Sequence, residues 1–140
     1  MIFRCNFEEL SALRHGARAV LDEYLPEEAA IAAPPEERER VANVLPRLQG
    51  DLSIGTLREQ RGLQKAVTAI VERLRLEMEV TVAATHPADE GAVAAYFDFA
   101  HAYSVLSRLD EIGREMEALI ELVTGVPPSG DVARTFVFPD

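Results

Sequence analysis

The sequence has very little of what stabilises secreted proteins or anchors proteins in membranes. Its 140 residues include one cysteine, Cys5, and no tryptophan. A single cysteine cannot form a disulfide within the chain, which fits a reducing compartment. No stretch approaches the ~18 consecutive apolar residues of a membrane span. The first ten residues, MIFRCNFEEL, lack the charged region, apolar run and cleavage site of a signal peptide. We therefore expect a cytoplasmic protein with no membrane partner.

Basic residues are also scarce. The 14 lysine and arginine residues compare with 24 aspartate and glutamate residues, giving a formal net charge of −10. Affinity for nucleic-acid phosphates needs a basic surface, so we expect no nucleic-acid partner. All basic residues but Lys65 are arginine, and with the many alanines this indicates the codon bias of a GC-rich, bacterial genome. Some basic residues gather between positions 58 and 75, but glutamates are interleaved with them, which predicts a solvated face of mixed charge: Arg58, Arg61, Lys65, Arg73 and Arg75, with Glu59, Glu72, Glu77 and Glu79.

Motifs of catalysis are missing as well. Gly50, Gly55 and Gly62 lack the spacing of a phosphate-binding loop, and no Gly-Lys-Ser/Thr follows them. The nucleophile-elbow motif Gly-x-Ser-x-Gly does not occur. Cys5 follows Arg4, but the sequence places no histidine or carboxylate so as to activate its thiol, and we interpret it as a structural residue. These absences predict a non-catalytic protein without a cofactor.

What the sequence has is a long helical stretch from Thr56 to Thr124, interrupted at Thr85-His86-Pro87. In its second part, residues of one face recur at alternating steps of three and four, a heptad seam that is apolar except at Asp98. The seam positions are Ala95, Asp98, Ala102, Val105, Leu109, Ile112, Met116, Leu119 and Val123. A weaker seam in the first part comprises Leu57, Gln60, Gln64, Val67, Val71, Leu74, Met78 and Thr81. The pattern predicts an antiparallel hairpin of helices over about 56–85 and 87–124.

Capping signals agree with these boundaries. Thr56 with Glu59 is a capping-box pair, in which each side chain satisfies a backbone N–H of the first turn. Pro87 suits the first turn of the second helix, and Gly125 suits a left-handed residue after its end. Both helices also carry apolar residues off the seam, so each should contact at least two other helices, some of them from another copy of the chain.

The rest of the chain predicts two shorter helices and a strand-like segment at each end. The helices are expected over 8–25, with Asn6 and Glu9 as a capping pair, and over 36–49, where Pro46 should kink or shorten the helix. Residues 2–7 and 132–138 have strand-like patterns. Because single strands leave backbone groups without partners, we expect these two ends to pair, within one chain or between two.

Two features could carry a function. Asp98 and His101 lie one helical turn apart, as in metal-binding helical bundles, but a second such pair is missing, so we expect no metal site. Asp98 on the seam instead fits either a polar residue that fixes register or oligomeric state, or a solvated end of the seam. The aromatic residues Tyr96, Phe97, Phe99 and Tyr103 could line a ligand pocket, although core or interface is the favoured interpretation.

Taken together, residues 1–140 predict one all-α domain, a helical bundle built on the long hairpin. We expect a non-catalytic interaction or assembly protein that forms a homo-oligomer, with a dimer favoured. Two alternatives stay open: a small acidic adaptor, chaperone-like or inhibitory, that binds a basic protein, and a bundle that binds a metal or ligand through Asp98 and His101. The expected interface residues are Val105, Leu109, Ile112, Met116, Leu119, Tyr96, Phe99 and Tyr103.

Overall fold

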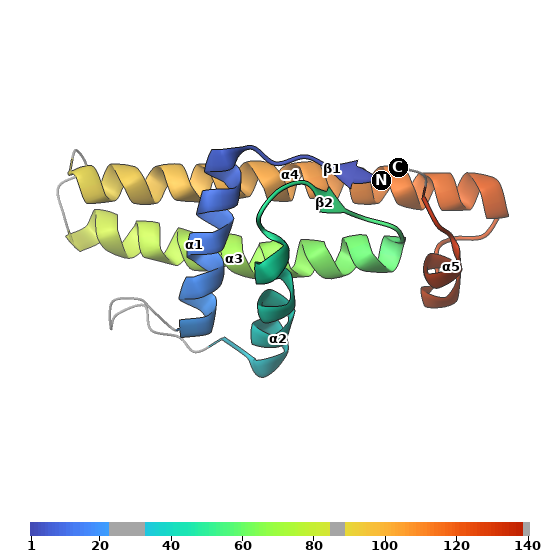
Figure 1. The fold of residues 1–140 in the computed structure, drawn as a ribbon, viewed down its shortest axis with the longest axis horizontal. Helices are drawn as coiled ribbons and strands as arrows, with labels where there is room; N and C mark the ends of the chain where they lie inside the picture. Colours follow the sequence, from blue (N-terminus) through green and yellow to red (C-terminus); the bar gives the residue numbers. More distant parts are fainter. Residues whose placement is uncertain (23–32, 85–88, 139–140) are drawn as a thin grey trace.

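The protein has the all-α fold built on a long hairpin that the sequence predicts. The computed structural model describes residues 1–22, 33–84 and 89–138 (Figure 1). The elements are β1 (Ile2–Phe3), α1 (Phe7–Asp22), α2 (Pro35–Val44), a 3-10 turn (Leu45–Arg47), β2 (Leu52–Ser53), α3 (Leu57–Ala84), α4 (Glu90–Thr124) and α5 (Gly130–Thr135).

Helices α3 and α4 form the hairpin, and α1 crosses both of them near the middle (Figure 1). Helix α2 packs on α3 beside α1, and the short α5 packs on α3 as well. Of the described elements, only α3 and α4 extend beyond α1 toward the turn of the hairpin (Figure 1). The expectation that each hairpin helix contacts at least two other helices is confirmed, because α3 contacts α1, α2, α4 and α5, and α4 contacts α1 and α3.

The predicted caps are present where the structure describes them. The backbone N–H of Glu9 donates to Asn6 Oδ1 at 2.8 Å, and the N–H of Asn6 donates to Glu9 Oε1 at 2.9 Å. The N–H of Glu59 donates to Thr56 Oγ1 at 3.1 Å, although the Glu59 carboxylate accepts from the N–H of Gly55 rather than from that of Thr56. Gly125 has φ 71°, the left-handed conformation that glycine adopts without strain.

The remaining boundaries differ slightly from those expected. Helix α4 begins only after Asp89, whose carboxylate accepts from the N–H of Gly91 at 2.8 Å. Pro87, expected in the first turn of the second hairpin helix, lies outside the described residues. Pro46 shortens its helix as expected: α2 ends at Val44 and the chain tightens into the 3-10 turn.

Helix α1 is fixed to the hairpin by a close crossing and by a buried ion pair. At the crossing, Gly16 is buried so tightly that an added Cβ would lie 2.6 Å from Ile70 Cγ2 and 2.9 Å from Leu74 Cγ. At the start of α1, the buried carboxylate of Glu9 pairs with the Arg108 guanidinium of α4. Arg108 also donates to the Arg4 carbonyl at 2.9 Å and lies 5.1 Å from the centre of the Phe3 ring.

The core is continuous from α1 through the middle of the hairpin. Both faces of α3 contribute to it, since seam residues such as Val67 and off-seam residues such as Ile70 are equally buried. In α4 the buried face is Ala92, Ala95, Ala102, Val105, Leu109, Gly113, Met116 and Ile120. The predicted seam positions Ala95, Ala102, Val105, Leu109 and Met116 are buried as expected, but two later positions differ by one residue. Gly113 and Ile120 take the inward places expected for Ile112 and Leu119, and Val123 is exposed.

The two ends of the chain do not pair with each other; both attach to the connector between α2 and α3. Strand β1 pairs antiparallel with β2, and the N–H of Ile54 donates to the Met1 carbonyl at 2.9 Å. At the other end, the N–H of Phe138 donates to the Gly55 carbonyl, also at 2.9 Å. The segment 132–138 is not a continuous strand, because α5 occupies Gly130–Thr135 before the chain extends to Phe138. The predicted need of the ends for backbone partners is thus met within the chain.

The close crossing at Gly16 makes a stability prediction. Replacing Gly16 with Ala should destabilise the protein by about 1–3 kcal/mol, because the new methyl group meets two branched side chains that are themselves buried. Gly62→Ala in α3 is the matched control, since a Cβ there meets nothing within 4 Å, and it should stabilise by about 0.5–1 kcal/mol. Urea unfolding measures both; a Gly16→Ala variant as stable as the parent would contradict the crossing geometry.

Candidate functional site

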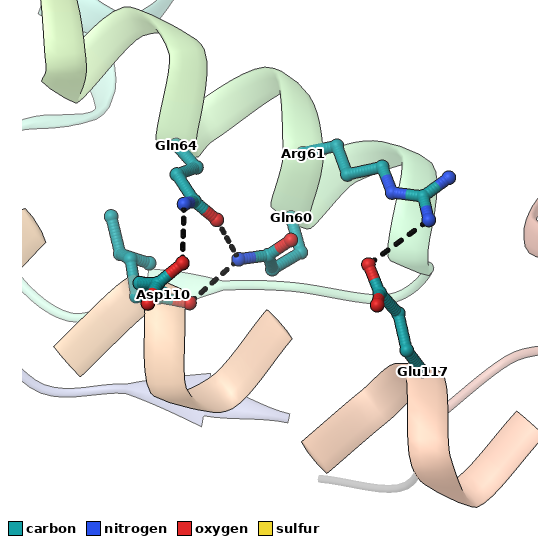
Figure 2. A network of polar contacts seen from close by, with 6 residues as sticks. Gln60, Arg61, Gln64, Asp110 and Glu117 are labelled. Carbon is teal, nitrogen blue, oxygen red and sulfur yellow. Dashed lines mark hydrogen bonds and ion pairs between the residues drawn. The ribbon is translucent and has the colours of Figure 1, made fainter. Parts of the chain in front are cut away.

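The first two turns of α3 are joined to α4 by a network of neutral and charged hydrogen bonds (Figure 2). The amide of Gln60, 1% exposed, donates through Nε2 to the Leu109 carbonyl at 2.7 Å and to Gln64 Oε1 at 2.8 Å. Gln64 Nε2 donates in turn to Asp110 Oδ1 at 3.1 Å. About two turns further along α4, Arg61 pairs with Glu117 at 3.0 Å. Each side chain of this network forms a hydrogen bond or ion pair with another residue of α3 or α4. The network therefore helps to align the two helices.

Gly113 makes room for this network. A Cβ at position 113 would lie 2.6 Å from Gln60 Nε2, so only glycine lets the amide approach the helix backbone this closely. Because the contact joins one residue of α3 to one turn of α4, a shift along the hairpin would leave the Gln60 amide buried without partners. The polar seam residues Gln60 and Gln64 therefore fix the register of the hairpin here.

Asp98 lies half-buried in a second polar cluster, where α1 meets the hairpin. His15 of α1 has its Nε2 3.1 Å from both carboxylate oxygens of Glu77 in α3. The hydrogen bond with Glu77 raises the pKa of the His15 imidazole, against the opposing effect of burial. Burial raises the pKa of the Asp98 carboxyl, while the nearby His15 lowers it and Glu77 raises it further. His101 also contributes to the field at Asp98.

This cluster was predicted only in part. The sequence places Asp98 and His101 on neighbouring positions of one helix, but His15 and Glu77 come from two other helices. Within the described residues, no group of three or more histidine, cysteine, aspartate or glutamate side chains has an arrangement that could hold a metal ion. His15 and Glu77 instead form a pH-dependent contact between α1 and α3.

The contact between His15 and Glu77 predicts how the stability of the protein depends on pH. Since the folded-state pKa of His15 is raised above 6.5, its contribution is fully present below pH 6.5 and is lost as the pH rises through the folded-state value. Glu77→Gln should therefore flatten the fall in Tm above pH 6.5, an effect of about 1 kcal/mol or less because the His15 side chain is 43% exposed. Glu79→Gln, two residues away and paired with Arg75, is the control and should leave the slope unchanged.

The predicted interface residues divide into three groups by burial. Val105, Leu109 and Met116 are buried within the chain's own core. Phe99 and Ile112 are half-buried and pack against that core. Tyr96, Tyr103 and Leu119 are exposed. Together with Phe97, the exposed residues form apolar surface that the core of the chain leaves uncovered.

Tyr96, Phe97 and Tyr103 belong to a stripe on the outer face of α4. They are 54%, 53% and 54% exposed, high values for large apolar rings. At 100° per residue, the stripe positions lie within about 120° of each other and opposite the buried face of α4. In order, the stripe is Val93, Tyr96, Phe97, Ala100, Tyr103, Ser104 and Ser107, and Glu111 is the next residue on this face. We call these seven residues the outer stripe.

Cys5 is a half-buried free cysteine. Burial, with the nearby carboxylate of Glu9, raises the pKa of its thiol to about 11. A thiol with that pKa is almost entirely protonated near neutrality and is a poor nucleophile.

Comparison with protein-family models, with curated proteins and with solved structures finds no match to this chain. In the parts of the chain that the structure describes, the helices are too short or too polar to cross a bilayer.

Proposed function

We propose that the protein is a non-catalytic, cytoplasmic interaction protein that forms a homodimer through the outer stripe of α4. The observation that carries the proposal is the exposure of three aromatic rings on one uncharged helical face of a chain with net charge −10. Water-exposed aromatic groups at regular helical spacing are characteristic of helix–helix interfaces.

A second copy of the chain is the occupant that best fits the pattern of the stripe. The residues lie symmetrically about Ala100, at three, four and seven positions on either side. If two stripes packed antiparallel about a two-fold axis at Ala100, Tyr96 would lie opposite Ser104 and Val93 opposite Ser107. Phe97 would lie opposite Tyr103. Large side chains would thus meet small ones or another ring, the complementarity that close helix packing requires.

Charge also favours this occupant. Two copies with net charge −10 repel one another across most of their surfaces. The outer stripe has no charged residue between Val93 and Ser107, so it is a face along which two copies can approach without pairing like charges.

The area predicts a dimer of modest affinity. Three aromatic side chains of roughly 200 Å² each, about half exposed, leave roughly 300 Å² of apolar surface. A stable interface needs about 800 Å² on each partner, so the flanking parts of α3 and α4 must contribute as well. We therefore expect dimers that dissociate on dilution.

Sedimentation equilibrium over a range of protein concentration tests the proposal. The parent protein should dimerise, and Ala100→Glu should be monomeric, because it brings two carboxylates together at the two-fold axis. Helix content should not change, nor should Tm at concentrations where the parent is also monomeric, since glutamate is a good helix former at a partly exposed position. A parent protein that stays monomeric to roughly millimolar concentration would overturn the proposal.

Ala118→Glu is the matched control. Ala118 is exposed and lies on the same face of α4, five helical turns or roughly 27 Å further along, outside the outer stripe. This variant should dimerise like the parent. Equal loss of dimer in both variants would place the interface elsewhere on α4, or indicate a general effect of added negative charge.

A further inference from the structure

A cavity lined by positive charge lies between α2, α3 and α5. It has a volume of about 530 Å³, within the range of small-molecule sites. Five cationic side chains line it: Arg40, Arg58, Arg61, Lys65 and Arg134. Among the described residues, no acidic side chain is part of its lining.

The fold gathers these side chains from distant parts of the sequence. Arg58, Arg61 and Lys65 are three and four residues apart, so they lie on one face of α3. Helix α2 supplies Arg40, and α5, which packs on α3, supplies Arg134. The predicted mixed-charge face holds further along α3, where Arg75 pairs with Glu72 and Glu79 at 2.7 Å. In the first turns of α3, the side that lines the cavity is not a face of mixed charge.

Few carboxylates neutralise the cavity. Arg61 pairs with Glu117 at 3.0 Å, and Arg40 lies 3.9 Å from Glu36, the limit of an ion pair. Arg58, Lys65 and Arg134 form no ion pair with any residue that the structure describes. Gathering like charges in one hollow costs stability, and a bound anion would remove that cost.

The cavity wall leaves room for a ligand. Its two remaining lining residues are Gly62 and Gly130, and a Cβ at either would have no atom within 4 Å. An anion can therefore approach the helix backbone between the long cationic side chains. Guanidinium groups present paired N–H donors that match two oxygens of one phosphate group.

We propose that this cavity binds a compact oligophosphate, a chain of two or three phosphate groups. Several cations around one hollow suit a ligand with several negative charges. The described lining has no aromatic ring on which a base could stack, so the phosphate groups themselves provide the recognition. The site lies on α3, toward the opposite end of the hairpin from the outer stripe, and does not depend on dimerisation.

Isothermal titration calorimetry of the full chain with inorganic triphosphate is the direct test. We expect saturable binding of one triphosphate per chain, with an affinity that falls as sodium chloride is added. A Lys65→Gln variant should bind roughly tenfold more weakly or worse, because it removes a charge-assisted contact. Arg75→Gln is the charge-matched control on the same helix and should bind like the parent. Absence of saturable binding by the parent, or equal loss in both variants, would overturn the proposal.

Variants at Gly62 separate a binding role from a structural one. Gly62→Glu should abolish triphosphate binding by placing a carboxylate in the cavity, while Gly62→Ala should retain it, and both should fold because the position has open space. Without ligand, Lys65→Gln should have the same Tm as the parent or a higher one; a lower Tm would show that Lys65 serves stability instead.

Adenosine triphosphate distinguishes the source of the phosphate groups. If the cavity recognises only the phosphate groups, adenosine triphosphate should bind with about the affinity of inorganic triphosphate. A nucleotide that binds more than roughly tenfold tighter would overturn that assignment, because the base or sugar would then contribute.

Discussion

The alignment of α3 with α4 is the constraint on which the other contacts depend. A heptad seam of small and aliphatic residues gives attraction along the whole hairpin, but it allows two helices to slide by a turn at little cost. The buried amide of Gln60 removes that freedom, since its donors reach the Leu109 carbonyl only where Gly113 opens the helix surface. With the register held, the Arg108 guanidinium meets Glu9 at the start of α1, and Glu77 meets His15 at its middle. The position of α1 across the hairpin is therefore a consequence of the register.

A hairpin of this length in a chain this small leaves surface uncovered. Helices α1 and α2 are short, and they cover the middle of the hairpin and one side of α3 (Figure 1). Helices α1 and α3 pack on the seam side of α4, and three aromatic rings are exposed on the opposite side. Packing thus gives α4 two different faces. Its inner face is completed within the chain, and the outer stripe is free for a partner.

Periodicity and capping chemistry were enough to predict the helices, because both depend on residues a few positions apart. Asn6 with Glu9, Thr56 with Glu59, and Gly125 were all recognisable for this reason. The features that were missed depend on where helices cross. Gly113 and Gly16 look like weak points of helices in the sequence, and only the crossing shows that each makes room for a neighbour. The difference at Ile112 has the same origin, because Gly113 rather than Ile112 faces Gln60. Arg40 and Arg134 lie too far from Arg58 in the sequence for any local pattern to join them.

The distribution of charge sets the kind of ligand that each surface can accept. At physiological ionic strength, charges on the surface are screened over about 8 Å, so an anion in the basic cavity responds to the nearby cations far more than to the distant acidic residues. A compact anion that stays within the cavity benefits fully from those cations. A nucleic-acid polymer would extend beyond it over the acidic surface, where each further phosphate is repelled. The same screening lets two chains of like net charge meet along the uncharged outer stripe. One acidic surface is thus compatible with both proposed contacts, because each occupies a place where the acidic residues are absent.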